Sequence, residues 1–240
     1  MSLITNPKRD PFGAAMWDYL KGNFQAAVKV DSDIAISDEI LVRYLFRSHS
    51  QMPEWEQRAL AACRGRVLDI GAGAGGHSLA LQTDGLEVVA MDVSPGAVSM
   101  MEHRGVKHVL HQSIWDFPPD HFDTLLMMMN GIGLVGDLKG LNRFLQLAPQ
   151  WLAPGGQILL DSSDIRYLFD DDQERIIQQH KPYYGIINYQ MSYGKVTSDP
   201  FDWIYVDFAR LETHARMFGF RAEKICDGPH FEYLARLVML

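Results

Sequence analysis

From residue 66 to the C-terminus, short apolar runs alternate with stretches that carry apolar residues at helical spacing. The runs have the length of buried strands, and strands that alternate with helices form a mainly parallel sheet with helices on both faces. The pattern therefore predicts an α/β fold. The expected strands are 67–70, 86–91, 106–111, 122–129, 157–163, 220–226 and 231–239, and the expected helices are 77–83, 95–104, 137–152 and 208–218.

The first strand, helix and second strand enclose a glycine-rich loop, in the sequence RVLDIGAGAGGHSLALQTDGLEVVAMDVSP of residues 66–95. Glycines let a backbone approach a ligand closely, and the start of the following helix offers unpaired N–H groups. Asp92 ends the second strand, where a carboxylate can accept the hydroxyls of a ribose. The unit therefore predicts a ligand that contains a nucleoside.

Two classes of cofactor use this geometry. Gly71, Gly73 and Gly76 fit G-x-G-x-x-G, the dinucleotide pattern, which is weak evidence by itself. Asp69 lies two positions before the first glycine and would repel a pyrophosphate, whereas the ammonium of a methionine moiety would tolerate it. An NAD-dependent oxidoreductase is therefore the alternative, and a cofactor with an amino-acid end is favoured.

The stretch V-L-D-I-G-A-G-A-G resembles motif I of the class I S-adenosylmethionine-dependent methyltransferases, and the sequence L-A-P-G-G from residue 152 resembles a second feature of that family. The resemblance is strong over 65–161 and moderate over the last forty residues. It implies a doubly wound, Rossmann-like fold with a mainly parallel seven-stranded sheet, and S-adenosylmethionine as the cofactor. The cofactor-binding residues implied are Asp69, Gly71, Ala72, Gly73, Gly75, Asp92, Val93, Ser113, Ile114 and Asn130.

Three of these positions carry specific expectations. Ser113 stands where the family often has an acidic residue that contacts the adenine amino group, so that contact is weaker here or made by another group. Ile114 and Val93 are expected to pack on the two faces of the adenine, and a core role for both is equally compatible with the sequence. Arg47, from the segment before the core, is a candidate for a forked pair with the cofactor carboxylate, although an exposed arginine on a helix is the favoured alternative.

Residues 1–64 precede the first core strand and are expected to form a helical cap. The expected helices are 14–28, a second that begins at Ser37, and a third that begins at Pro53. Methyltransferases commonly place helices before the first core strand. We therefore expect a single methyltransferase domain over 1–240, with the cap at 1–64, the core at 65–164 and 207–240, and an insertion at 165–206.

The insertion begins with an acidic stretch at 170–172, which is expected to be a solvated loop or helix start. It continues with apolar and aromatic residues that alternate with polar ones over 187–193, and Phe201, Trp203 and Tyr205 repeat the alternation after a turn. This pattern predicts an aromatic β-hairpin. Such a hairpin would be either a lid over the acceptor or a contact between subunits of a homo-oligomer, and both readings stay open.

The 240 residues carry a net charge of −8, with a sequence pI near 5.5. The chain therefore lacks the basic footprint of nucleic-acid or membrane binding, which makes a nucleic-acid acceptor unlikely and favours a small molecule. Two cysteines, Cys63 and Cys226, suggest neither a disulfide framework nor a zinc site. With no apolar run of signal-peptide or membrane-span length, the expected location is cytoplasmic.

Methyl transfer from a sulfonium depends on alignment and exclusion of water, and it needs a general base only if the acceptor must lose its proton early. The sequence therefore indicates catalytic groups weakly. Asn130 and Asp161, at the ends of two strands, are the candidates, and no metal is expected. For His49, Asp164, His180, Tyr183 and Tyr184 a surface or structural role is favoured. A protein of this fold that binds the cofactor without turnover is the remaining alternative.

Overall fold

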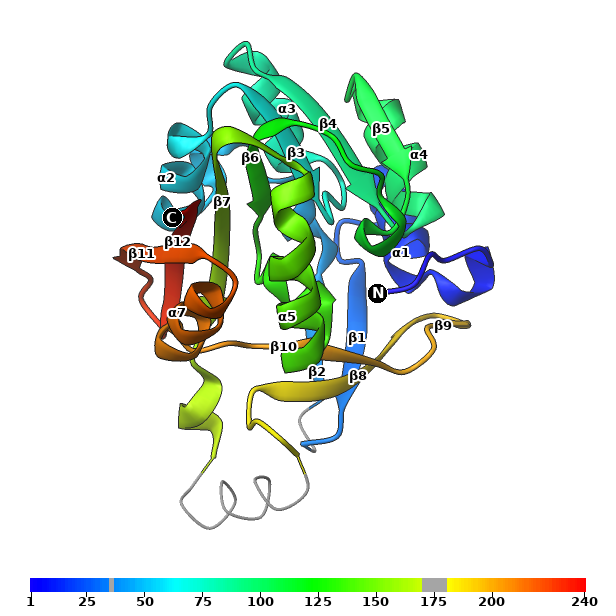
Figure 1. Cartoon of the computed structure of the whole chain (residues 1–240). Coiled ribbons are helices and arrows are strands. Elements are labelled where there is room, and N and C mark those ends of the chain that lie inside the picture. Colours follow the sequence, from blue (N-terminus) through cyan, green and yellow to red (C-terminus); the bar gives the residue numbers. More distant parts are fainter. Residues whose placement is uncertain (35–36, 170–180) are drawn as a thin grey trace.

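In the computed structural model, which describes residues 1–34, 37–169 and 181–240, the core is a seven-stranded sheet with helices on both faces (Figure 1). Its strand order is β11-β12-β7-β6-β3-β4-β5. Strand β12 runs opposite to the other six strands of this sheet, since it pairs antiparallel with both β7 and β11. The strands are β3 (Arg66–Ile70), β4 (Glu87–Asp92), β5 (His108–His111), β6 (Phe122–Met127), β7 (Leu152–Ser163), β11 (Phe220–Asp227) and β12 (Glu232–Met239). The predicted doubly wound fold is confirmed.

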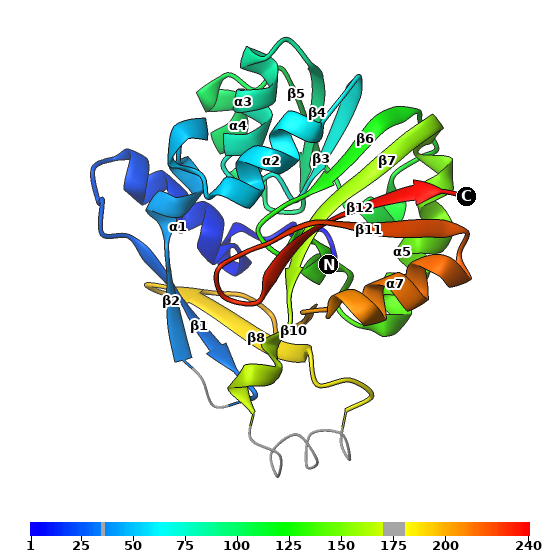
Figure 2. The ribbon, with the colours of Figure 1, turned by 90° about the vertical axis from the view of Figure 1, so that its left-hand side faces the viewer.

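Helices α2 (Glu54–Ala62), α3 (Gly76–Thr83) and α4 (Pro95–Arg104) cover one face of this sheet, and α5 (Leu138–Leu147) and α7 (Phe208–Met217) cover the other (Figure 2). Each face has its own buried apolar cluster. Leu81 of α3 packs with Leu159 of β7 on the first face, whereas Phe144 of α5 packs with Leu160 on the second. Because side chains alternate between the two faces along β7, this strand contributes to both apolar clusters.

A second, smaller sheet lies across the edge of the main sheet where β3, β6 and β7 end (Figures 1 and 2). Its order is β10-β8-β1-β2, and β9 pairs with β8. The predicted aromatic hairpin is present, since Tyr189 pairs with Phe201 and Ile187 with Trp203. The strands are β1 (Ala27–Ser32), β2 (Ser37–Leu41), β8 (Ile186–Tyr193), β9 (Val196–Thr197) and β10 (Phe201–Ile204).

The N-terminal cap is only partly helical, which corrects the sequence-based expectation. Helix α1 (Pro11–Leu20) ends before Gly22, and the residues from Ala27 onward form β1, in which buried Val28 and Val30 alternate with exposed positions. The segment after Ser37 is β2, followed by a 3-10 helix. Both segments become strands because β1 pairs with β2 on one side and with β8 of the insertion on the other.

The cap is attached to the core through the buried carboxylate of Asp10. Its Oδ1 accepts the N–H of Gly13 at the start of α1, and its Oδ2 accepts the hydroxyl of Ser94 and the N–H of Gly96 at the start of α4. A Cβ at Gly96 would lie 2.3 Å from the Cα of Gly13, so two glycines permit the close approach of the helices.

The remaining turns are 3-10 helices, and one of them shortens a predicted helix. Helix α5 ends at Leu147 instead of 152, because Pro149 lies in the following 3-10 turn and cannot continue the α-helical hydrogen bonds. The acidic stretch 170–172 and His180 lie outside the described residues. The 3-10 helices are η1 (Pro7–Arg9), η2 (Val42–Phe46), η3 (His49–Gln51), η4 (Ile114–Asp116), η5 (Gly131–Val135), η6 (Ala148–Gln150) and η7 (Ile165–Leu168).

Candidate active site

The glycine loop between β3 and α3 leaves open space where side chains would otherwise stand. Gly71 and Gly73 have positive φ angles of 76° and 56°, and a Cβ on either would meet only one side chain, that of Leu134 at 3.7 Å or Leu45 at 3.9 Å. Gly75 differs, since its Cβ would lie 2.8 Å from Val106. The first two glycines therefore border a cradle for a ligand, whereas the third serves packing.

Ala72 is held in the loop by its backbone. Its N–H donates to the carbonyl of Met91, as does the N–H of Gly71, so the loop is fixed against the end of β4. The side chain of Ala72 is buried.

Asp92, at the end of β4, faces this loop. Its Oδ2 accepts the N–H of Gly73 and its Oδ1 accepts the N–H of Ser94, both at 2.9 Å. Each carboxylate oxygen has a second acceptor site, which suits a pair of ligand hydroxyls. Burial raises the pKa of Asp92 and the nearby Asp10 adds to this, while the two N–H groups oppose it.

Asp69 points away from the cradle toward the α3 face of the sheet. It is buried, and its Oδ2 accepts a 2.6 Å hydrogen bond from the hydroxyl of Ser78. Burial raises its pKa, against the attraction of the His77 side chain. Asp69 therefore acts on the loop through α3 in this structure, and direct contact with a cofactor ammonium remains a prediction.

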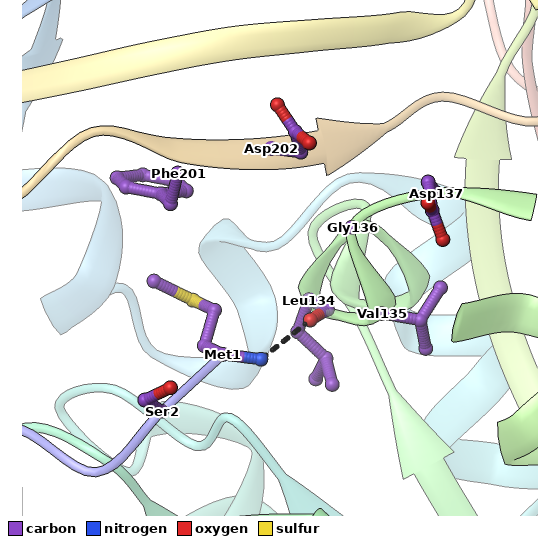
Figure 3. Close-up of a pocket in the computed structure, with 8 residues that line it drawn as sticks. All are labelled: Met1, Ser2, Leu134, Val135, Gly136, Asp137, Phe201 and Asp202. Carbon is purple, nitrogen blue, oxygen red and sulfur yellow. Dashed lines mark hydrogen bonds between the residues drawn. The ribbon is translucent and has the colours of Figure 1, made fainter. Parts of the chain in front are cut away.

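Two of the residues expected around an adenine, Ser113 and Val93, contact the first four residues of the chain. The hydroxyl of Ser113 donates to the carbonyl of Met1 at 2.9 Å, and the Met1 ammonium donates to the carbonyl of Leu134 (Figure 3). The carbonyl of Val93 accepts the N–H of Ile4. Ser113 would have to exchange its partner to bind a purine amino group.

Ile114 is buried within the large core cluster that also contains Leu134. In this structure its side chain therefore has a core role. A hollow of about 330 Å³ opens beside the Met1 contact (Figure 3). It is lined by Met1, Ser2, Leu134, Val135, Gly136, Asp137, Phe201 and Asp202.

Asn130 and Asp161 are brought into contact at the ends of β6 and β7. Oδ1 of Asp161 accepts the N–H of Asn130 at 2.7 Å, and Oδ1 of Asn130 accepts the hydroxyl of Ser162 at 2.7 Å. Asn130 and the preceding Met129 have φ angles of 54° and 62°, in the left-handed region, which asparagine tolerates and in which methionine is strained. Such strain gathers at functional sites.

The carboxyl of Asp161 is nearly inaccessible to solvent. Burial raises its pKa to about 7, and Glu56 nearby adds to this, while the Asn130 N–H, His77 and the indole of Trp55 lower it. The Trp55 N–H is itself buried without a completed hydrogen bond among the described residues. Asp161 is therefore poised to exchange a proton near neutral pH.

Arg47 is not free in this structure. Its Nη2 lies 2.8 and 3.0 Å from the two oxygens of Glu56, and its Nε donates to the carbonyl of Tyr44. Oε2 of Glu56 also lies 3.0 Å from Nε2 of His77 and can accept a hydrogen bond from it. Sequence reasoning missed Glu56 and His77, because α2 and the first turn of α3 meet only in the folded chain.

The two tyrosines that were considered as acceptor-side groups each have a hydrogen-bond partner within the protein. Tyr183 donates to Asp207 at 2.8 Å and Tyr184 to Asp164 at 2.6 Å, and burial raises the pKa of both phenols far above that of a useful base. His49 is exposed in η3.

The residues present fit S-adenosylmethionine. Gly71 and Gly73 leave space beside the backbone, and Asp92 retains acceptor capacity for two hydroxyls. None of the helices in the described part of the chain is long and apolar enough to cross a membrane.

Comparison with known proteins agrees with this geometry. A family described as "Methyltransferase domain" matches residues 41–218. The structure of a SAM-dependent methyltransferase from Bacteroides fragilis in complex with S-adenosyl-L-homocysteine is 45% identical with a TM-score of 0.90, covering 100% of this chain and 98% of that one. The CcbJ methyltransferase from Streptomyces caelestis, 14% identical with a TM-score of 0.61 over 80% of this chain and 92% of its own, shares the fold.

A curated relative, demethylmenaquinone methyltransferase from Clavibacter sepedonicus, is 36% identical over 110 residues. The match covers 43% of this chain and 43% of that protein, so it spans less than half of the relative's length. Family, fold and glycine-loop geometry agree: the chain belongs to the S-adenosylmethionine-dependent methyltransferases, and S-adenosylmethionine is its cofactor.

Proposed function

We propose that the protein transfers the methyl group of S-adenosylmethionine to a small-molecule acceptor at the carboxyl ends of β6 and β7. The observation that carries this proposal is the open cradle at Gly71 and Gly73 beside Asp92, which follows β3 and so lies next to β6 and β7 with the Asn130–Asp161 pair. When bound, the cofactor supplies an electrophilic methyl group on a sulfonium.

Within this proposal the chain binds and orients. Asp92 would hold the ribose hydroxyls, Gly71 and Gly73 give the amino-acid end room, and Ser113, Ile114 and Val93 border the purine. The second sheet would form the roof that excludes water, since Trp203 of β10 packs directly on Gly133 of η5. Alignment and dehydration are what this reaction needs most.

Asp161 is the proposed general base for an acceptor that must lose its proton. Asn130 fixes Oδ1 through its N–H, which leaves Oδ2 to accept the proton as the acceptor atom attacks the methyl carbon. With a pKa of about 7, the carboxyl can take up and release that proton near neutral pH. Asn130 is the positioning residue of this pair.

The inserted hairpin is proposed to be a lid, because β8 is paired on both sides, with β1 and β10, and so belongs to the roof. Deleting it would leave only β1 and β2 of the second sheet. A homo-oligomer that uses the edge strands β2 or β10 is the other reading, and size-exclusion chromatography with light scattering distinguishes them.

A cytoplasmic location stays a prediction. The two free thiols, Cys63 and Cys226, are compatible with it.

Independence of metal is also a prediction. Among the residues that the structure describes, no three His, Cys, Asp or Glu side chains are grouped to hold a metal ion. Turnover should therefore be the same with a chelator and with added magnesium. Loss of activity on chelation that magnesium restores would contradict this.

The proposal is tested by release of labelled methyl product from S-adenosylmethionine across a panel of small metabolites, with demethylmenaquinone included because the curated relative is named for it. Turnover of at least one acceptor is expected. Calorimetry should show binding of S-adenosylmethionine and its demethylated product, and none of NAD. Tight cofactor binding without turnover of any acceptor would favour the alternative, a protein of this fold that binds the cofactor without catalysis.

A further inference from the structure

Asn130 is held by two neighbouring residues of β7 whose side chains lie on opposite faces of the main sheet. Asp161 accepts the backbone N–H of Asn130, and Ser162 donates its hydroxyl to Oδ1 of the Asn130 side chain, both at 2.7 Å. Side chains alternate along β7, where Leu159 belongs to the apolar cluster of one face and Leu160 to that of the other. A carboxyl on the first face and a hydroxyl on the second are therefore connected through Asn130.

Ser162 also contacts the roof, the second sheet that is proposed to cover the acceptor. Its oxygen accepts the N–H of Val206 at 3.0 Å, and Val206 follows β10 in the segment that leads to α7. The Asn130 side chain adds a hydrogen bond from Nδ2 to the carbonyl of Ile204, at the end of β10, at 3.2 Å. A hydrogen-bonded path thus runs from Val206 through Ser162 and Asn130 to the carboxyl of Asp161.

This path lies inside the protein, where the loss of one partner leaves a polar group unsatisfied. Ser162 and Val206 are buried, and Tyr233 of β12 donates to the carbonyl of Val206 at 2.7 Å. The backbone of Asn130 has a φ of 54°, in a region that few residues with a side chain occupy without supporting contacts. The direction of the N–H that Asp161 receives therefore depends on the side-chain hydrogen bonds of Asn130.

We propose that Ser162 is a positioning residue of the methyl transfer, which couples the position of the roof to the carboxylate of Asp161 through Asn130. The inference rests on the proposed function and deepens it, because it states how the acceptor site is regulated. A roof in place over the acceptor holds Asn130, and Asn130 holds the base. Cofactor binding at the loop after β3 does not use this path, so the coupling acts on turnover and not on cofactor affinity.

The coupling has a measurable consequence for the ionisation of Asp161. Burial raises the pKa of this carboxyl to about 7, while the Asn130 N–H favours the carboxylate, so a loosened N–H should raise the pKa further. The variants described below leave the other titratable and charged groups around the carboxyl unchanged. These groups are Glu56 on α2 with its partner Arg47, His77 on α3, Asp69 on β3 and Tyr233 on β12.

Two variants interrupt the path at different points. Ser162→Ala removes the hydroxyl that joins Asn130 to Val206, whereas Asn130→Gly keeps the backbone N–H and suits the positive φ but removes the side-chain hydrogen bonds. Each should lower kcat about tenfold through misalignment of the base, and each should move the pH of half-maximal kcat upward by about half a pH unit. Ser162→Ala should change the dissociation constant of S-adenosylmethionine less than about threefold.

The double variant Ser162→Ala/Asn130→Gly tests whether the two residues act on one path. Its kcat should be no lower than that of Asn130→Gly alone, because the hydroxyl has nothing left to position once the Asn130 side chain is gone. Losses of kcat that multiply in the double variant would show that the two residues act independently, and they would contradict the path.

Ser198→Ala is the matched control for the loss of a buried hydroxyl. Ser198 is buried and its oxygen accepts the N–H of Met191 at 2.9 Å, toward the opposite end of β8 from Ile186, which pairs with Ile204. The control should lose stability and keep the kcat and the pH profile of the wild type. A shift of the pH profile in Ser198→Ala equal to that in Ser162→Ala would show a general effect of lost stability, and it would overturn the coupling.

Urea unfolding at pH 4.5 and pH 8 gives a readout that needs no acceptor. At pH 4.5 the folded carboxyl of Asp161 is protonated in every variant, whereas at pH 8 a folded-state pKa half a pH unit higher raises the unfolding equilibrium constant about threefold. Ser162→Ala should therefore lose more stability at pH 8 than at pH 4.5, and Ser198→Ala should lose the same at both.

Equal losses of stability for Ser162→Ala at the two pH values would overturn the coupling and leave the methyltransferase site in place. A wild type that binds S-adenosylmethionine but methylates no acceptor would instead overturn the proposed function. The unfolding comparison would then decide by itself whether Ser162 acts on Asp161.

Discussion

The N–H of Gly73 donates a 2.9 Å hydrogen bond to Oδ2 of Asp92, and this contact holds the glycine loop after β3 and the carboxyl end of β4 as one unit. The same carboxylate that shapes the loop is the one proposed to receive the ribose. Binding and loop geometry are therefore coupled in a single side chain.

Asp92→Ala should weaken binding of S-adenosylmethionine by about 2–3 kcal/mol, roughly a hundredfold, because it removes charge-assisted hydrogen bonds to two hydroxyls. Isothermal titration calorimetry measures this. Asp84→Ala, at the exposed end of α3, is the control and should bind like the wild type. Equal affinity of the wild type and Asp92→Ala would place the ribose elsewhere.

Gly71→Val should abolish cofactor binding, because the side chain would fill the space beside Leu134 that the ligand needs. Backbone strain must be separated from this steric effect, since Gly71 has a φ of 76°. Gly85 has a φ of 86° and no neighbour within 4 Å of its Cβ position, so Gly85→Val carries similar strain away from the site.

Thermal unfolding and a cofactor titration on both glycine variants make the comparison. Both should lose stability, and only Gly71→Val should lose binding. Loss of binding in Gly85→Val as well would show that the effect comes from stability and not from the cradle.

The central strand, loop, helix and strand unit was predictable because its signals are local. The apolar run before Gly71, the Ser94 cap of α4 and Gly105 after it each act within a few residues, and all are observed. The contact of Asp161 with Asn130 follows from their shared position at strand ends, which sequence reasoning also supplies.

The features that could not be predicted from the sequence depend on contacts between residues far apart along the chain. Val28 and Ile40 fit a helical spacing when read alone, and they lie in strands because β1 pairs with β8 from the other end of the chain. The Arg47–Glu56–His77 group needs three segments to meet. Even within the loop, only the folded structure separates Gly75, which packs on Val106, from the two open glycines.

Asp161→Asn should stabilise the protein above neutral pH. In the folded state the carboxyl has a pKa of about 7, above its ordinary value, so stability falls between about pH 4 and pH 7 as the unfolded chain ionises first. The amide cannot ionise, and its oxygen still accepts the Asn130 N–H. The expected gain is roughly 2–4 kcal/mol at pH 8 and near zero at pH 4.5.

Urea unfolding at the two pH values measures the difference. The same variant should lose turnover of acceptors that must be deprotonated, while its cofactor affinity stays within a few fold. A gain in stability that is equal at both pH values would show that it does not come from the ionisation of Asp161.

Gly133→Ala should uncouple turnover from cofactor binding. Gly133 lies in η5, between the cradle and the roof, and a Cβ there would lie 2.0 Å from Nε1 of Trp203 on β10. The indole is rigid, so the roof must shift, at a cost of about 1–3 kcal/mol typical of overpacking. If the second sheet seals the acceptor site, kcat should fall at least tenfold while the dissociation constant of the cofactor changes less than threefold.

The double variant Gly133→Ala/Trp203→Ala tests the cause, because the cost of the added methyl should vanish once the indole is gone. A normal kcat in Gly133→Ala, together with an altered oligomeric state on size-exclusion chromatography, would instead support the second sheet as a contact between subunits.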